Sequence, residues 1–358
     1  MPKNELERLR RQIDALDAQF LKLLNRRAGI VLKVGKAKKT SREEFYTPHR
    51  EKLLMERLKK RNKGPFPTRA IPSVFSEIIS ASRSLHAPMK VAYLGPEATF
   101  THMAALRHFG RSCEMIPMTS ISRVFEEVEN KRTECGVVPI ENSTEGVVGA
   151  TLDRFQDSSL KIGAEIVLPI AHHFLTVTGG TRGVQRIYSH PQAVAQCRPW
   201  LEDKFSNTPI VEVESTARAA ARAAEDSRSG AIASEEAAHV YRLKIAERHI
   251  EDNPNNMTRF LVLGRKNPGM TGSDKTSILF SVKDQVGVLY RMLEPFYRNK
   301  INLTKIESRP LKKKVWEYIF YLDMDGHLEE KRLQKALKEL DQYCLFVKVL
   351  GSYPKATV

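Results

Sequence analysis

The stretch CGVVPIENSTEGVVGATLDRF (135–155) places a short apolar run, a polar turn and a helical pattern in direct succession. The same succession begins at KVAYLG (90–95), RIYSH (186–190), IVEVES (210–215) and AIAS (231–234). Strands that alternate with helices predict an α/β domain with a largely parallel sheet. In such sheets ligands gather at the carboxyl ends of the strands, where helix N-termini present free N–H groups to anions. The polar residues of these turns either cap helices or line one polar cleft.

Before this region, the sequence predicts one helix of about 35 residues with a charge on its apolar face. Apolar residues recur in steps of three and four from Leu6 to Ala37, and Arg27 stands where another is due. Desolvating a guanidinium is costly without an anionic partner. An ion pair with another helix and an anionic ligand would both explain Arg27, and the pattern does not separate them.

Two further cations on this helix differ in their reach. Lys38 follows Arg27 by eleven residues, close to three turns, so both project from about the same face. Arg10 lies about 26 Å from Arg27 along the axis, so one small molecule cannot contact both arginines of one chain. A helix this long also cannot bury its stripe within a small domain. If both arginines bind substrate, the site is shared between chains, so both observations predict a homodimer or higher homo-oligomer.

Two shorter helices are expected at 50–61 and 68–85, which makes the first segment all-α. After a linker at 267–274, the C-terminal segment has the βαββαβ order of a ferredoxin-like α+β sandwich. Its expected strands are 276–284, 301–308, 315–323 and 345–353, and its expected helices are 287–298 and 328–340.

The composition excludes several classes of protein. With 358 residues, 41% of them hydrophobic and 28% charged, the chain is too long for one core and is neither collagen-like nor wholly disordered. Neither an export signal nor an apolar run of the ~18–20 residues that span a bilayer is visible, so no membrane partner is expected. The four cysteines are scattered without a CxxC, which suggests neither a disulfide framework nor a metal site. We expect a cytoplasmic protein.

The net charge of +16 is concentrated in residues 1–89, which carry 21 Lys and Arg against 9 Asp and Glu. Such an excess fits a polyanion, a small anionic substrate or a solvated helix face. A single-strand nucleic-acid platform would interleave aromatic residues with the basic ones. Residues 1–63 contain only Phe20, Phe45 and Tyr46 as aromatics, so no nucleic-acid partner is expected.

Five motifs of the middle segment resemble prephenate dehydratase. They are GPEATF (95–100), VPIENSTEG (138–146), SHPQA (189–193), ESTARAA (214–220) and MTRF (257–260). Their common order makes the resemblance specific, whereas the Thr-Arg-Phe triplet alone would carry nothing.

The two flanking segments also resemble known domains. The first looks like the all-helical chorismate mutase, through LRRQIDALD (9–17), VGKAK (34–38) and the Arg-Glu pair (50–51). The last is similar to an ACT regulatory domain, through GVLY (287–290) and ESRP (307–310). The resemblance implies a multidomain chain of the bifunctional chorismate mutase–prephenate dehydratase family of phenylalanine biosynthesis. Its expected parts are an all-α mutase domain (1–88), a two-lobed α/β dehydratase domain (89–267) and an α+β ACT domain (275–358).

For the helical domain, the resemblance implies the Claisen rearrangement of chorismate, a dianion, to prephenate by positioning and electrostatic stabilisation. The implied roles are carboxylate binding for Arg27 and Arg50, donation to the ether oxygen for Lys38, ring-hydroxyl binding for Glu51, and a reach into the neighbouring chain's site for Arg10. Ser82 belongs to the same implied site. Thr47 stands where the family often has Asp, and His86 stands where it usually has Gln. A histidine donates as a neutral tautomer or as imidazolium, so the pH dependence would change.

For the middle domain, the resemblance implies loss of water and carbon dioxide from prephenate to give phenylpyruvate. Thr258 would assist departure of the ring hydroxyl, and further residues would line or neighbour the cleft: Asn142, Ser189, Gln196, Ser215, Thr216 and Arg259. Ser189 and Ser215 also fit simple helix caps. Ala98 stands where the family often has Gly, a difference that matters only where the backbone needs a positive φ.

For the last domain, the resemblance implies phenylalanine binding between ACT domains of two chains, and feedback inhibition. The implied residues are Gly287, Val288, Leu289, Asn302, Leu303, Glu307, Ser308 and Arg309. Without the resemblance, Gly287 would be a helix start and ESRP a strand end.

Two alternatives differ in function. A non-catalytic solute-binding protein also has two α/β lobes around a polar cleft, but the missing export signal and the Thr258 motif argue against it. The nearer alternative is a dehydratase whose helical domain serves only for dimerisation, which substrate assays would separate. Neither reaction requires a cofactor, and the expected small-molecule partners are chorismate, prephenate and phenylalanine.

Overall fold

The computed structural model describes residues 3–41, 46–85, 88–282, 285–310 and 318–356. The chain falls into two units, which we describe separately. The first unit comprises residues 1–47, 55–89 and 109–114, and the second comprises 48–54, 90–108 and 115–358. None of the described helices combines the length and apolarity that a membrane span requires.

The first unit is helical, as expected. Its elements are α1 (Lys3–Ser41), most of α2 (Pro48–Arg61), the short 3-10 helix η1 (Thr68–Ala70) and α3 (Ile71–Ser84). Helix α1 is continuous over 39 residues, which confirms the single long helix. Its apolar stripe is largely uncovered in one chain, with Ile13, Leu16 and Phe20 each at least half exposed.

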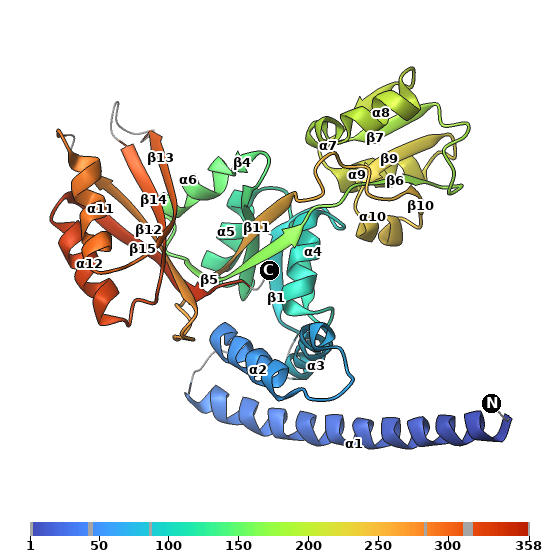
Figure 1. The fold of residues 1–358 in the computed structure, drawn as a ribbon, viewed down its shortest axis with the longest axis horizontal. Coiled ribbons are helices and arrows are strands. Elements are labelled where there is room, and N and C mark those ends of the chain that lie inside the picture. Colours follow the sequence, from blue (N-terminus) through green and yellow to red (C-terminus); the bar gives the residue numbers. More distant parts are fainter. Residues whose placement is uncertain (1–2, 42–45, 86–87, 283–284, 311–317, 357–358) are drawn as a thin grey trace. The chain divides into compact units, whose positions relative to one another are not determined.

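The second unit begins with two α/β lobes, each built on its own sheet (Figure 1). The first sheet has the order β2–β1–β3–β11–β5, with β4 beside β3. Its elements are β1 (Lys90–Leu94), α4 (Phe100–Phe109), β2 (Glu114–Met118), α5 (Ile121–Glu129), β3 (Cys135–Asn142), β4 (Gly146–Val147), α6 (Gly149–Asp157), β5 (Lys161–Pro169) and β11 (Met257–Gly264).

The sheet of the second lobe has the order β10–β6–β9–β7–β8. Its elements are β6 (His173–Thr176), β7 (Arg186–Ser189), α7 (Pro191–Gln196), α8 (Arg198–Phe205), β8 (Ile210–Glu212), α9 (Thr216–Ala224), β9 (Ser229–Ala233), α10 (Glu235–Val240) and β10 (Lys244–Glu247). The chain passes between the lobes twice, through residues 170–172 and residues 248–256. Two lobes with two connections confirm the two-lobed α/β architecture.

The expectation of one largely parallel sheet is wrong. Strand β1 is parallel to β3, and β7 is parallel to β8 and β9, but β11 runs antiparallel to both β3 and β5. Strand β6 is likewise antiparallel to β9 and β10. The reason is that β11 re-enters the first sheet from the other lobe without the crossover helix that a parallel connection needs.

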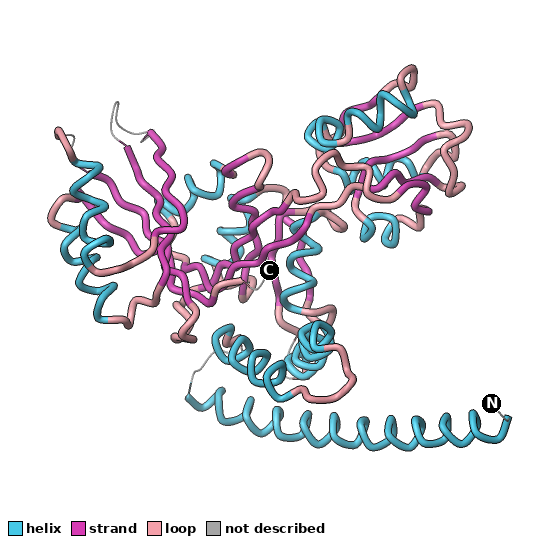
Figure 2. The backbone as a smooth tube through the Cα atoms, viewed as in Figure 1, coloured by secondary structure: helices cyan, strands magenta, loops and turns pink. Residues whose placement is uncertain are grey.

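The C-terminal part has the predicted βαββαβ order. Its elements are β12 (Asp274–Val282), α11 (Val288–Arg298), β13 (Leu303–Pro310), β14 (Tyr318–Asp325), α12 (Lys331–Asp341) and β15 (Cys344–Pro354). The strands form an antiparallel sheet in the order β13–β14–β12–β15, and both helices cover the same face of it (Figure 2). The ferredoxin-like sandwich is therefore confirmed.

The opposite face of this sheet packs on the first lobe in one shared core. Leu279, Ile319 and Tyr321 of the C-terminal sheet belong to the same buried cluster as Phe155 and Ile162 of the first lobe. The backbones of β15 and β5 also come close, because a Cβ at Gly351 would lie 2.4 Å from the Ile162 carbonyl oxygen. Apolar burial of this kind fixes the C-terminal part against the first lobe.

Candidate functional site

A cavity of about 260 Å³ lies between the two α/β lobes, where the chain passes from one sheet to the other. The residues that line it are Thr99, Phe100, Thr101, Pro139, Asn142, Val148, Ile170, His172, His190, Gln192, Ala193, Gln196, Glu214, Ser215, Thr216, Thr258 and Phe260. Most of them come from the segments after β1, β3, β7 and β8, which are four of the five turns picked out in the sequence. The rest come from β3, from β11 and from the first crossing between the lobes. The fifth turn does not contribute; its Ser234 hydroxyl donates to the Ala98 carbonyl oxygen instead.

Glu214 is the one carboxylate among the described residues that line this cavity, and the other polar side chains there carry hydroxyl, amide or imidazole groups. No lysine or arginine is found among the described residues that line it. Helices α4 and α9 begin at the cavity wall, so their first N–H groups and the positive ends of their dipoles face it. The cavity thus suits an anion that is held by partial charges rather than by a full cation.

Thr258 and Asn142 form the centre of the site. They are paired across β11 and β3, and the Asn142 amide nitrogen donates to Thr258 Oγ1 at 2.7 Å. The side-chain oxygen of Asn142, Oδ1, accepts hydrogen bonds from the backbone N–H groups of Thr144 and Glu145. The amide nitrogen is therefore the end of the side chain that faces Thr258. Because Thr258 Oγ1 is the acceptor of this bond, its own proton is left to donate to a group in the cavity.

A chain of hydrogen bonds continues from this pair to a buried histidine. Asn142 Nδ2 donates to Asn256 Oδ1 at 2.8 Å, and Asn256 Nδ2 donates to Gln196 Oε1 at 3.1 Å. Gln196 Oε1 also lies 3.0 Å from His172 Nε2, so the imidazole must donate there and carries its proton on Nε2. Burial lowers the pKa of His172, against the opposing effects of Gln196 and Glu251, and so favours the neutral ring.

Five of the seven residues expected at the dehydratase site line the cavity: Asn142, Gln196, Ser215, Thr216 and Thr258. Ser215 also caps α9, since its hydroxyl accepts the Arg218 N–H, so lining and capping hold together. Ser189 is fully buried outside the lining and donates to the His190 carbonyl oxygen. Arg259 is not among the lining residues either.

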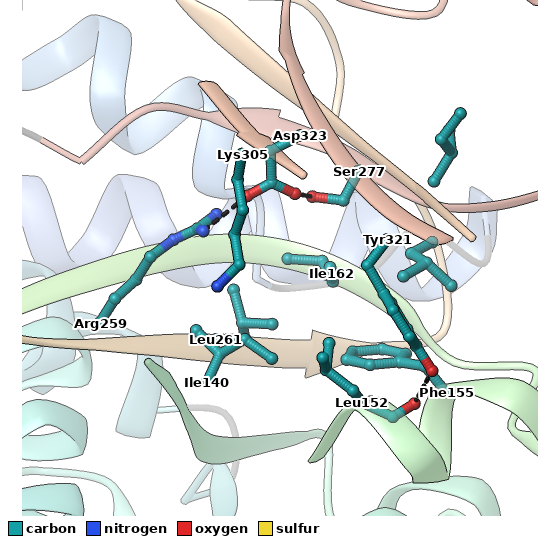
Figure 3. Close-up of a pocket in the computed structure, with 12 residues that line it drawn as sticks. Ile140, Leu152, Phe155, Ile162, Arg259, Leu261, Ser277, Lys305, Tyr321 and Asp323 are labelled. Carbon is teal, nitrogen blue, oxygen red and sulfur yellow. Dashed lines mark hydrogen bonds and ion pairs between the residues drawn. The ribbon is translucent and has the colours of Figure 1, made fainter. Parts of the chain in front are cut away.

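Arg259 points away from the cavity because neighbouring side chains of a strand face opposite sides. Its guanidinium donates to Glu165 at 2.7 Å, to Asp323 at 2.6 Å and to the Tyr353 hydroxyl at 2.9 Å. Burial opposes the charge, but Asp323 and Glu165 hold the pKa of Arg259 above its usual value. Arg259 therefore belongs to the boundary with the C-terminal sheet (Figure 3).

The sequence motifs contained several lining residues that were not singled out. Thr99 and Phe100 lie in GPEATF, His190 and Gln192 in SHPQA, and Glu214 in ESTARAA. His172 and Asn256 lie outside every motif and are brought in by the two crossings between lobes.

Ala98, which stands where the family often has Gly, has the positive φ that makes this difference matter. Its φ is +67°, and it is buried between a bond from its N–H to His102 Nδ1 and a bond to its carbonyl from Ser234. A left-handed conformation costs a non-glycine residue about 1 kcal/mol.

In the helical unit, Arg27 and Ser82 are brought together. Arg27 Nη1 of α1 donates to Ser82 Oγ of α3 at 2.6 Å, and that hydroxyl donates to the Ile78 carbonyl oxygen at 2.6 Å. Partial burial lowers the pKa of Arg27 from its usual value. No carboxylate is paired with Arg27 within the described part of the chain, so the interhelical ion pair is not seen there.

The other residues expected at the mutase site are described to different degrees. Arg10 is exposed on α1, and Lys38 lies in its last turns. Thr47 precedes α2 without a side-chain cap bond, while exposed Arg50 and half-buried Glu51 lie in the first turn of that helix. His86 lies outside the described residues.

The residues expected to bind phenylalanine lie at the start of α11 and along β13. Gly287 precedes α11 with a φ of +77°, and nothing lies within 4 Å of the position of a Cβ there. Glu307 pairs with Tyr321 and Arg309 with Ile319, on the face turned to the first lobe, whereas Ser308 alternates to the other face. Arg309 Nε lies 3.5 Å from Asp153 Oδ1 of α6. The rest of the set lies nearby in sequence: Val288, Leu289, Asn302 and Leu303.

Fold and site together define a multidomain enzyme with a helical domain, a two-lobed α/β domain and a regulatory-type α+β domain. Family models match in the same order: chorismate mutase type II over residues 9–87, prephenate dehydratase over 91–268, and the ACT domain over 276–342.

Similar proteins have the same organisation. A bifunctional chorismate mutase/prephenate dehydratase of Aquifex aeolicus is 51% identical over 98% of both chains. The solved prephenate dehydratase of Arthrobacter aurescens, in complex with L-Phe, is 34% identical with a TM-score of 0.69, over 74% of this chain and 90% of that one. GqqA, described as a quorum quenching acylase, is 28% identical with a TM-score of 0.68, over 75% and 98%. The chain belongs to the family of bifunctional chorismate mutase/prephenate dehydratases.

Proposed function

We propose that this protein converts chorismate to prephenate in its helical domain and prephenate to phenylpyruvate in its α/β domain, with phenylalanine as feedback inhibitor. The observation that carries the proposal is the Thr258 hydroxyl, which faces the cavity with its proton left free by the Asn142 amide. The domain boundaries that we propose are 1–88, 89–267 and 275–358.

Dehydration requires the ring hydroxyl of prephenate to leave as water while a ring carboxylate leaves as carbon dioxide. The C–C bond to that carboxylate breaks, its electron pair forms the aromatic ring, and the C–O bond breaks at the opposite carbon. A donor at the departing oxygen stabilises the negative charge that develops there. The Thr258 O–H serves as this donor, and the proton that completes the water comes ultimately from solvent.

The rest of the cavity positions the substrate. The N-termini of α4 and α9 offer N–H groups to the carboxylates. Because His172 and Asn256 hold the side-chain oxygen of Gln196, its NH₂ group donates one proton to Glu145 Oε1 at 3.4 Å and keeps the second proton for the substrate. Asn142, Ser215 and Thr216 supply further neutral contacts. Ser189 and Arg259 do not line the cavity, and we assign them to support the residues that do.

The mutase reaction needs cations at two carboxylates and a donor at the ether oxygen, since no bond to the protein forms. Arg27 supports this assignment, because it is half-buried, fixed by Ser82 and unpaired with any carboxylate among the described residues. We assign Arg50 to the second carboxylate, Glu51 to the ring hydroxyl, and Lys38 and His86 to the ether oxygen. Thr47 belongs to the same assigned set.

We also propose a homo-oligomer in which Arg10 completes the mutase site of another chain. The exposed stripe of α1 supports a partner chain, because a surface helix normally buries its apolar face. Arg10 and Arg27 lie on one continuous helix, about 26 Å apart along its axis, so they serve different sites. A loss of mutase activity on dilution, together with dissociation in analytical ultracentrifugation, would test this arrangement.

We place the protein in the cytoplasm. All four cysteines are free thiols, as is usual in a reducing compartment. Phenylalanine is assigned to the ACT domain, at the start of α11 and along β13.

The test is an assay of the purified full chain with chorismate and, separately, with prephenate, with and without phenylalanine. Phenylpyruvate from both substrates, suppressed by phenylalanine, is the expected result. Product from prephenate alone would instead support the dehydratase whose helical domain only dimerises. An acylase substrate is included because GqqA, described as a quorum quenching acylase, has a similar fold. No reaction with that substrate is expected, since no hydroxyl of a described lining residue is bonded to an imidazole as an activated nucleophile would be.

A further inference from the structure

The strand pair that carries Thr258 and Asn142 has the C-terminal sheet against its reverse side. Thr258 pairs with Asn142, and the next pair along the two strands is Arg259 with Glu141. Side chains alternate along strands, so the first pair faces the cavity and the second faces the C-terminal sheet. One residue step therefore separates the dehydratase site from the domain boundary.

Charged side chains of the C-terminal sheet hold this second pair, and Figure 3 shows two of them, Asp323 and Lys305, beside Arg259. Asp323 of β14 accepts from Arg259 at 2.6 Å. Lys305 of β13 lies 2.8 Å from Glu141 Oε2, in an ion pair without the alignment of a regular hydrogen bond. Lys275 of β12 adds a third contact by donating to Glu165, the other carboxylate of Arg259, at 2.9 Å.

The boundary is packed tightly enough to transmit a displacement. A cavity of about 20 Å³ is enclosed by Arg259, Lys305, Asp323 and Tyr321 together with apolar side chains of the first lobe. This volume has room for about one water molecule. Close-packed interiors of this kind pass strain from one element to the next.

We propose that Arg259 and Glu141 are positioning residues for dehydration, held in place from the ACT domain by Asp323 and Lys305. This inference rests on the proposed dehydratase function. By fixing β11 and β3 one residue away from the site, the four side chains preserve the 2.7 Å contact between Asn142 and Thr258. Removal of these charged side chains lets β3 and β11 move relative to each other, so the Thr258 hydroxyl no longer directs its proton into the cavity.

The same contacts give the ACT domain a route to the site. Lys305 lies on β13 between Leu303 and Glu307, two residues assigned to phenylalanine. A ligand that displaces β13 moves Lys305, and with it Glu141 and its neighbour Asn142. The inference therefore names the residues through which phenylalanine acts on dehydration.

The test uses the full chain with Lys305→Met, and with Lys348→Met as the matched control. Lys348 is also a half-buried lysine at this boundary, but it donates to the carbonyls of Phe155, Gln156 and Ser158, away from the site. We expect Lys305→Met to lower kcat for prephenate by about tenfold or more with KM within about twofold, since Glu141 loses the half-buried cation that pairs with it. Lys348→Met should leave kcat within about twofold of the unchanged protein, and Lys305→Arg should restore most of the rate.

A second readout does not depend on activity. The methyl resonance of Thr258, assigned by its loss in Thr258→Ala, should shift in Lys305→Met and in Asp323→Asn but not in Lys348→Met. Equal behaviour of Lys305→Met and Lys348→Met in both measurements would overturn the inference, because the charges would then only join the domains. If Lys305→Met does not fold, Asp323→Asn decides by the same criteria. If the protein without substitutions is inactive toward prephenate, the proposed function is contradicted. The shift of the Thr258 methyl resonance would then still show whether Lys305 and Asp323 position Thr258.

Discussion

The helical unit and the dehydratase cavity differ in the charges that they offer to their proposed substrates, chorismate and prephenate, which are both dianions. Arg27 puts a full cation on a helix face, whereas the described lining of the cavity holds no lysine or arginine and relies on helix N-termini and neutral donors. The proposed rearrangement keeps both carboxylates throughout, so cations there do not oppose it. The proposed dehydration expels one carboxylate as carbon dioxide, and a cation bound to that group would stabilise the reactant more than the transition state. The difference teaches that a site that must release charge is better built from partial charges.

The largest effect is expected from Thr258→Ala. This change removes the donor at the departing oxygen and should lower kcat for prephenate by roughly 10²–10⁴, as loss of a positioned proton donor does. Chorismate rearrangement should be unchanged, because its expected residues lie in the helical domain. Thr258→Ser keeps the hydroxyl and serves as control. Retention of most of the dehydratase rate in the alanine variant would remove Thr258 from the chemistry.

Arg27→Met probes the cationic side of the comparison. Loss of a charged hydrogen bond should reduce kcat/KM for chorismate by about 10- to 100-fold while prephenate dehydration stays unchanged. Arg27→Lys keeps the charge without the planar pair of donors, so an intermediate rate is expected. If the mutase rate is the same in both variants as in the protein without substitutions, the Arg27–Ser82 contact is only structural.

Buried and half-buried histidines make the dehydratase lobes sensitive to acid. Burial lowers the pKa of His172, His173 and His190 in the folded chain below about 6.5, the value in the unfolded chain. At a pH between the folded and the unfolded pKa, the unfolded chain therefore binds more protons than the folded one. The free energy of unfolding should therefore fall as the pH drops below about 6.5. Urea denaturation between about pH 5 and 7 measures this, and His172→Gln, which retains a donor for Gln196, should reduce the slope. An unaltered slope would mean that His172 does not contribute.

Ser215→Ala should give the smallest effect. The variant loses the hydroxyl that accepts the Arg218 N–H at the start of α9, which should lower the free energy of unfolding by about 1 kcal/mol. Ser215→Asn restores a capping oxygen and with it the stability. If the asparagine variant also restores dehydratase activity, Ser215 acts in the cavity only as a helix cap.

Local patterns in the sequence determined the elements and much of the site. Periodicity and turn chemistry act within a few residues, so they located the long helix that became α1, the helix expected at 50–61 and found at 48–61, and the βαββαβ order of the C-terminal part. Motif resemblance supplied Thr258, Asn142 and Gln196, which the structure brings into one cavity.

Tertiary structure alone decided the rest, because these features depend on contacts between distant segments. The antiparallel course of β11 follows from the second crossing between lobes, and the same crossings bring His172 and Asn256 to residues far away in sequence. Arg259 adjoins Thr258 in the chain, yet strand alternation and the carboxylate of Asp323, 64 residues later, turn its side chain to the opposite face. A sequence pattern records which residues follow one another, whereas the direction of a side chain is set by whatever packs on either side of its strand.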